Sequence, residues 1–236
     1  MSPVFDPAKV ALRPLPFIKS LHVLPSRKAI YVNNAKVACS TIKLALQRAE
    51  LGDPEYQPAP SVHSHETSPL LTWPVLEIGM VPDILREHFT FSFVRCPYGR
   101  LQSAFANKIV PAQRKGKFRV HAGFAPKEEP SFDDFVESVT AQEPTRQNPH
   151  WRPQWINLSA DAITFDFIGR LEEFSADWQR VADRLDLPRM PQRAGKSSDR
   201  SVAPYSRAAA ERVRAFYARD FEVFGYDTDP APYLAH

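Results

Sequence analysis

Short apolar runs and helically spaced apolar residues alternate along this chain, and each change of spacing marks a new element. Apolar or alternating runs predict buried strands at 29–32, 90–94 and 162–169. Apolar positions three or four residues apart follow each run and predict helices that begin near Ser40 and Leu171 and after Pro97. Strands interleaved with helices are typical of α/β proteins. We therefore expect a single α/β domain with a mainly parallel central sheet flanked by helices.

Capping residues and composition set the expected boundaries. Gly52 stands where a helix C-terminal glycine is expected, and Ser131 begins the Ser-x-x-Asp spacing of a capping box. Residues 112–130 are basic and weakly patterned, so we expect a loop there. We assign residues 1–28 to an extended N-terminal lead-in and residues 29–236 to the functional domain.

Composition and charge exclude several classes of protein. Of the 236 residues 43% are hydrophobic and 24% are charged, and a net charge of +3 is too small to indicate nucleic-acid binding by itself. No apolar run reaches the roughly 18–20 residues of a spanning helix, and Met1–Pro16 lacks the apolar core of a secretory signal. Two cysteines, Cys39 and Cys96, make neither a disulfide framework nor a zinc site. We expect a soluble, reduced, cytoplasmic protein without a membrane partner.

The turn after the first predicted strand combines a cation with hydroxyl groups. Lys36 can reach over an anion, and Ser40 and Thr41 can donate hydroxyls at the first helical turn. A helix N-terminus adds free N–H groups and a partial positive charge, which favour an anion. A lysine and hydroxyls at a strand-to-helix turn also occur in a Walker A loop. The glycines of the Walker A sequence are absent here, because no glycine lies between 31 and 51. The plain alternative is that both hydroxyls only cap the helix and Lys36 is solvated.

A second turn places another cation at the carboxyl end of an apolar strand, where ligands bind in open α/β sheets. Arg95 follows the strand, and Ser103 lies about two helical turns further on. Together they can hold an anion through a charge-assisted contact and a hydroxyl. Alternatively, Arg95 pairs with a carboxylate, Ser103 is a surface hydroxyl and the nearby Arg100 is a surface cation. Two such turns in one domain indicate a ligand with two phosphate-like groups, a doubly anionic nucleotide.

Both turns resemble the phosphosulfate-binding motifs of the sulfotransferases, specifically the carbohydrate sulfotransferase group (sulfotransferase family 2). The first motif corresponds to Ala-Lys-Val-Ala-Cys-Ser-Thr-Ile-Lys at 35–43, and the second to Phe-Val-Arg-Cys-Pro-Tyr-Gly-Arg-Leu-Gln-Ser-Ala-Phe-Ala-Asn-Lys at 93–108. Further similar blocks lie at 131–136, 150–154 and 165–169. The blocks run in order over most of the chain, and their combination is specific although each piece is not.

The resemblance implies a P-loop-like fold, 3′-phosphoadenylyl sulfate (PAPS) as sulfuryl donor, and a hydroxyl of a carbohydrate or small molecule as acceptor. Carried over by motif, Arg95 and Ser103 would hold the 3′-phosphate. Apart from the motifs, the polar segment 196–201 before the last predicted helix could close over the nucleotide through Arg200. Lys36 would stabilise charge on the leaving phosphate oxygen, and no metal is required. The 5′-phosphosulfate would be held by the whole first turn: Lys36, Val37, Ala38, Cys39, Ser40 and Thr41.

The chain also departs from the group. Its animal members carry an N-terminal membrane anchor and lumenal disulfides, and from the sequence we expect neither here. A small intracellular hydroxyl compound therefore stays open as acceptor beside a glycan. In the second motif, Cys96 and Gly99 stand where acidic residues are common.

Two histidines are candidates for the base that accepts the acceptor's proton. A base with a pKa near the working pH suits this role, and relatives place a histidine between the two motifs. Here His63 and His65 occupy that interval. We favour His63 over His65, against the alternative that they are ordinary loop histidines.

Three other functions are weighed against a sulfotransferase. A P-loop-like nucleotide-dependent kinase is disfavoured by the missing glycines and by the lack of an acidic magnesium ligand after a strand. A non-catalytic nucleotide-binding module would not need the candidate histidine. Binding of nucleic acid has only the basic run 113–119 in its favour, and such a run is usually a solvated surface. Trp151 and Trp155 are expected in packing rather than in an acceptor cleft.

Overall fold

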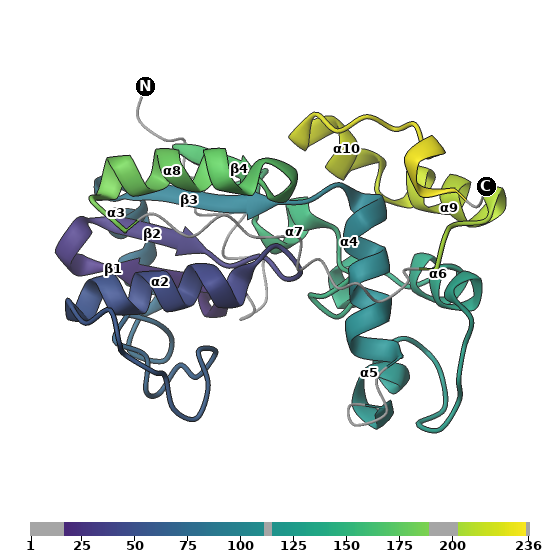
Figure 1. The fold of residues 1–236 in the computed structure, drawn as a ribbon, viewed down its shortest axis with the longest axis horizontal. Coiled ribbons are helices and arrows are strands. Elements are labelled where there is room, and N and C mark those ends of the chain that lie inside the picture. Colours follow the sequence, from purple (N-terminus) through teal and green to yellow (C-terminus); the bar gives the residue numbers. More distant parts are fainter. Residues whose placement is uncertain (1–16, 111–114, 189–202, 235–236) are drawn as a thin grey trace. The chain divides into compact units, whose positions relative to one another are not determined.

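A four-stranded sheet forms the centre of the first of two units in this protein. The computed structural model describes residues 17–110, 115–188 and 203–234. Contacts group these residues into one unit within Met1–Val94 and Ile156–Arg193 and a second within Arg95–Trp155 and Ala194–His236. The sheet runs in the order β1 (Leu21–Leu24), β2 (Ala29–Val32), β3 (Phe89–Val94) and β4 (Phe167–Arg170), as Figure 1 shows. Since β2, β3 and β4 are parallel and only β1 is antiparallel, the predicted mainly parallel sheet is confirmed.

Both faces of this sheet are buried, which explains the nearly continuous apolar strands. Tyr31 of β2 lies opposite Phe91 of β3, with ring centroids 5.5 Å apart. Ile30 and Ser92 point to the other face and are also fully buried. In the described part of this unit the sheet is accompanied by α2 (Cys39–Leu51), α3 (Val81–Glu87), the end of α7 (Gln154–Asn157) and α8 (Phe174–Leu185).

Helices α2 and α8 join one hydrophobic core with the strands. Ile42 and Leu46 of α2 belong to the same buried cluster as Trp178 of α8 and Phe93 of β3. The first helix ends as predicted, because Gly52 adopts a left-handed conformation with φ of 65°.

The described part of the second unit contains helices and no strand. Its elements are α4 (Pro97–Ala104), a π-helical turn (Phe105–Ile109), α5 (Lys115–His121), α6 (Phe132–Thr140), the first half of α7 (Gln154–Asn157), α9 (Arg207–Phe216) and α10 (Ala218–Phe224). Aromatic residues dominate its core, among them Tyr98, Phe135, Trp151, Tyr205 and Phe221.

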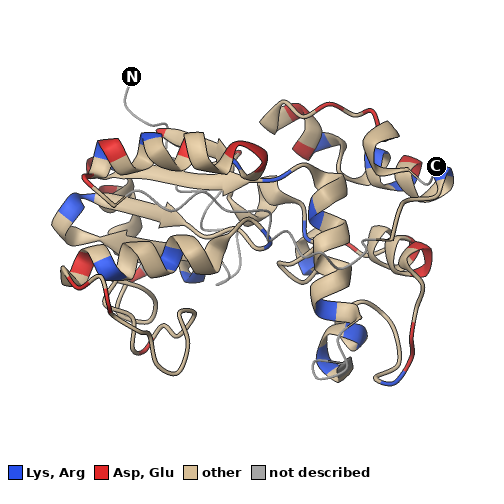
Figure 2. Ribbon diagram, viewed as in Figure 1, with Lys and Arg blue, Asp and Glu red and all other residues tan. Residues whose placement is uncertain are grey.

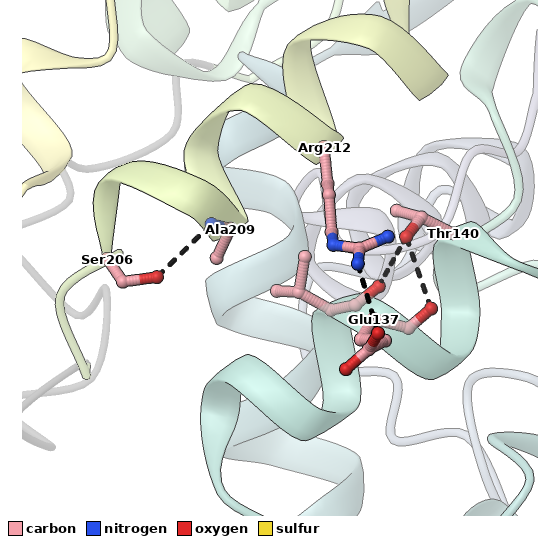
Figure 3. A network of polar contacts seen from close by, with 6 residues as sticks. Glu137, Thr140, Ser206, Ala209 and Arg212 are labelled. Atoms are coloured by element: carbon pink, nitrogen blue, oxygen red, sulfur yellow. Dashed lines mark hydrogen bonds and ion pairs between the residues drawn. The ribbon is translucent and has the colours of Figure 1, made fainter.

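Polar contacts fix α6 against α9 within this unit (Figure 3). Arg212 of α9 donates to the Glu137 carboxylate of α6 at 3.0 Å. The Ser206 hydroxyl caps α9 by accepting the Ala209 N–H at 3.1 Å. At the start of α6, Ser131 and Asp134 form the predicted capping box.

Two expected elements are different in the structure. The predicted loop at 112–130 is wrong over 115–121, where α5 forms. This helix carries basic residues and no acidic one (Figure 2), but Arg119 is buried and donates its Nε to the Ile109 carbonyl at 3.3 Å. A charged residue therefore occupies a buried position of the helix, so the usual helical spacing of apolar residues cannot be recognised in the sequence. The strand expected at 162–169 forms at 167–170, because Ile163 lies in a turn closed by the Ser159 carbonyl.

The N-terminal segment holds a strand that the sequence did not predict. Leu21–Leu24 pairs with β2 inside the segment assigned to a lead-in, and Phe17 and Ile18 before it are buried. The boundary between a lead-in and a domain at residue 29 stays a prediction.

Candidate anion-binding turns and base

The first turn combines two left-handed residues with an uncapped helix. Lys36 and Ala38 have φ angles of 71° and 63°, although neither is glycine, whereas the β-branched Val37 between them avoids this region. Ala38 is the N-cap of α2, and no side chain caps this helix. Turns that contain left-handed residues can direct successive backbone N–H groups toward one point, as in known anion-binding loops. Left-handed non-glycine residues cost about 1–3 kcal/mol each, and such strain is typical of functional sites.

Buried amides anchor this turn to the sheet. The Asn34 side chain directly after β2 is fully buried and donates to the Phe93 carbonyl of β3 at 3.1 Å. Asn157 donates to the Asn34 side-chain oxygen at 3.3 Å. The sequence analysis missed Asn34, and the available signal was an amide side chain immediately after an apolar strand.

The structure brings His63 to the start of α2. Its Nε2 lies 2.9 Å from the Ser40 hydroxyl, and both side chains are exposed. The loop that carries His63 is fixed from α2, because the buried Gln47 side chain donates to the Val62 carbonyl at 3.2 Å. Two residues predicted to share a site, Ser40 and His63, are thus in direct contact.

His65 has a different environment from His63. Its ring stacks on the buried His22 ring with a centroid distance of 5.6 Å. Burial, and then the charges of Lys43 and Lys19, lower the pKa of His65. Burial also lowers the pKa of His22 well below its usual value, with further contributions from Lys43, His65 and His63.

Lys43, the second cation of the first motif, is buried rather than solvated. Its side chain is 3% exposed, and burial lowers its pKa from 10.5 to about 8, against a smaller opposing effect of Cys39. The charged form of Lys43 is therefore held at an energetic cost inside this unit.

The second turn is built by hydrogen bonds within the second unit. Arg95 follows β3 in the chain and is half-buried, and one side chain holds both its backbone N–H and its carbonyl. The Arg95 N–H donates to Gln154 Oε1 at 3.0 Å, while Gln154 Nε2 donates to the Arg95 carbonyl at 2.8 Å. Its guanidinium lies against the first turn of α4, where a Cβ on Gly99 would be 3.2 Å from Arg95 Nε. Ser103 lies half-buried near the end of α4.

Arg100 is a buried structural residue and not a surface cation. It is 2% exposed and donates to the Pro149 and Arg152 carbonyls, both at 2.8 Å. Trp151, which these bonds enclose, is fully buried and packs edge-on against Phe135, so the expected packing role is confirmed for this residue.

The Asp220 side chain holds the backbone at Gln154 and Trp155 in place. Its two carboxylate oxygens accept the N–H groups of Gln154 and Trp155 at 2.8 and 2.9 Å. Burial raises the pKa of Asp220 to about 6, although these hydrogen bonds and Arg100 act in the opposite direction. The sequence analysis missed Asp220. Its signal was an acid on the apolar face of a helix, beside Phe221 and one turn from Phe224.

The remaining predicted site residues are placed as follows. Val37 is fully buried, Thr41 is half-buried, and Cys39 begins α2. Cys39 and Cys96 are free thiols. Arg200 lies outside the described residues. Within those residues no group of three or more histidine, cysteine or acidic side chains is arranged to hold a metal ion.

A mainly parallel sheet with a candidate anion-binding turn between a strand and a helix is typical of α/β proteins of P-loop-like architecture. Residues 19–227 match the model of a family described as "Sulfotransferase family", so the chain belongs to the sulfotransferase family. The resemblance to carbohydrate sulfotransferases is confirmed by similarity to individual members. No solved structure gives a significant match.

Human carbohydrate sulfotransferase 14 is 31% identical over 164 residues, which cover 60% of this chain and 43% of the human protein. The zebrafish (Danio rerio) protein of the same name is also 31% identical, over 60% of this chain and 45% of its own length. Rat carbohydrate sulfotransferase 11 is 23% identical over 89% of this chain and 67% of its own length. The match thus spans less than half the length of the first two relatives.

These relatives correct one expectation. The chain matches animal carbohydrate sulfotransferases, the members of the group that carry a membrane anchor, so the description of this protein as cytoplasmic conflicts with them and is wrong as it stands. It rested on a missing anchor and missing disulfides in a chain that matches only part of its relatives, and such an absence carries no information on location. No helix in the described ranges is both long and apolar enough to cross a bilayer.

Proposed function

We propose that this protein transfers the sulfuryl group of PAPS to a hydroxyl of a carbohydrate acceptor. The observation that carries the proposal is the contact of His63 with Ser40 at an uncapped helix N-terminus behind two left-handed residues. Such a turn fits the phosphosulfate of a donor, because its backbone N–H groups and Lys36 favour an anion. The names of the relatives support a carbohydrate as acceptor.

Each turn has its own part of the donor in this proposal. Residues 36–41 bind the 5′-phosphosulfate, and Arg95 with Ser103 binds the 3′-phosphate. A guanidinium suits a terminal phosphate because it offers paired donors in one plane.

The reaction is an in-line transfer. The acceptor hydroxyl gives its proton to Nε2 of His63 as its oxygen bonds to sulfur. The bond between sulfur and the 5′-phosphate oxygen breaks, and adenosine 3′,5′-bisphosphate is the second product. Lys36 stabilises the charge that develops on that phosphate oxygen. His63 must exchange its contact with Ser40 for the acceptor hydroxyl. It suits the role of base better than His65, whose pKa is lowered by burial.

A transfer assay tests this proposal. The protein is incubated with PAPS and a panel of desulfated polysaccharides, and the sulfated product and adenosine 3′,5′-bisphosphate are both quantified. We expect acceptor-dependent release in the wild type and a roughly 10²- to 10⁴-fold lower kcat in His63→Ala. His121→Ala, at an exposed histidine, is the control. Transfer from ATP but not from PAPS would support the kinase alternative, and binding without turnover the non-catalytic one.

A further inference from the structure

The Gln154 side chain makes an unusual pair of hydrogen bonds with the backbone of one residue, Arg95. It is fully buried, and its amide oxygen and nitrogen bond to the N–H and carbonyl of Arg95 at 3.0 and 2.8 Å. A neighbouring strand would normally supply such a pair of bonds. Here a side chain 59 residues away supplies both, so it fixes the two peptide groups on either side of the Arg95 Cα, from which the side chain extends.

Gln154 is itself held in place. The Asp220 carboxylate accepts its N–H at 2.8 Å and that of Trp155 at 2.9 Å. Before Gln154 in the chain, the Arg100 guanidinium donates hydrogen bonds to the carbonyls of Pro149 and Arg152. The segment 149–155 is therefore fixed by charged, buried groups of α4 and α10, and hydrogen bonds to charged groups are the stronger ones.

We propose that Gln154, fixed by Asp220, is a positioning residue that directs the Arg95 guanidinium toward the 3′-phosphate of the donor. This inference rests on the proposed function for the identity of the anion. Bidentate recognition of a phosphate needs the guanidinium within a fraction of an ångström of its productive place. Free rotation about the backbone φ and ψ bonds of Arg95 would lose that placement. The space over Gly99 leaves room for the guanidinium on one side.

The role predicts a specific loss. Replacing Gln154 by methionine keeps the volume but removes both hydrogen bonds, and Gln154→Asn keeps the amide but shortens its reach. Both variants should bind adenosine 5′-monophosphate as the wild type does. Their preference for adenosine 3′,5′-bisphosphate over the monophosphate should fall at least about tenfold, which corresponds to about 1.4 kcal/mol.

Gln142→Met is the matched control. Gln142 also lies in the second unit and bonds to the Trp151 indole and the His121 carbonyl, but not to Arg95. This variant should lose stability in urea without any change in the preference for the bisphosphate. An unchanged preference in folded Gln154→Met and Gln154→Asn, or an equal loss in Gln142→Met, would overturn the positioning role.

A second readout separates this inference from the proposed function. The Arg95 Nε–Hε resonance, assigned by its loss in Arg95→Lys, reports the placement of the guanidinium without any ligand. We expect it to shift and broaden in both Gln154 variants and to stay unchanged in Gln142→Met. A wild type without preference for the bisphosphate would contradict the proposed function, while the resonance would still show whether Gln154 positions Arg95. A resonance unaffected by either Gln154 variant would overturn the inference.

Discussion

The two candidate anion-binding turns differ in what holds their anion-binding residues in place. The first turn is shaped by the left-handed backbone of Lys36 and Ala38, and Asn34 before it is bonded to Phe93 and Asn157. In the second, Arg95 is held by Gln154 and indirectly by Asp220, residues 59 and 125 positions away in the sequence. Long-range hydrogen bonds therefore support both turns. The first adds local backbone strain, whereas in the second such bonds hold the backbone of the candidate phosphate-binding residue itself. This difference decides how each should respond to mutation.

The largest effect is expected at the second turn, in Asp220→Ala. The change leaves the N–H groups of Gln154 and Trp155 buried without an acceptor, at a cost of about 1–3 kcal/mol each. The free energy of unfolding should therefore fall by about 3 kcal/mol in urea denaturation. Glu222→Ala removes an exposed acid from the same helix and should change it by less than about 1 kcal/mol. Equal effects of the two variants would contradict the dependence of this turn on Asp220.

At the first turn, Lys43→Met should stabilise the protein in a pH-dependent way. The pKa of Lys43 is about 8 in the folded protein, below its usual 10.5. Both states are protonated below pH 8, so the full cost of burying the charge, at most about 3 kcal/mol, applies there. Between pH 8 and 10.5 the folded protein loses this proton first, and the stability of the wild type rises.

Lys43→Met should therefore gain about 1–3 kcal/mol at pH 7 and much less at pH 10, measured by urea denaturation at both values. Lys117→Met, at an exposed lysine, is the control and should show no such difference. A gain that is equal at both pH values would show that packing, and not the buried charge, is responsible.

The smallest effect tests the strain in the first turn directly. Ala38→Gly should raise the free energy of unfolding by about 0.5–1 kcal/mol, since glycine adopts a left-handed conformation without a steric cost. Ala45→Gly, inside the same helix, should lower it by about 1 kcal/mol. Thermal denaturation of both variants measures the contrast. Equal destabilisation by both would mean that Ala38 carries no strain.

The same contrast explains what the sequence could predict. The first turn, its strand and its helix follow from residues 29–52, so periodicity and local chemistry identified them. Lys36 could not be recognised as left-handed, because no glycine marks the position. At the second turn the sequence singled out Arg95 as a candidate, but the contacts of Gln154, Asp220 and Arg100 are created only by folding. The buried Arg119 misled the prediction for 112–130 for the same reason, because a charge was read as solvent-exposed.

Isothermal titration with adenosine 3′,5′-bisphosphate and adenosine 5′-monophosphate tests the central claim most directly. The wild type should bind the bisphosphate at least about tenfold more tightly. Lys36→Ala should weaken the binding of both ligands equally, because both carry the 5′-phosphate. Arg95→Ala should remove the preference for the bisphosphate and leave the affinity for the monophosphate unchanged. A preference that persists in Arg95→Ala, or a wild type without one, would contradict the assignment of one phosphate to each turn.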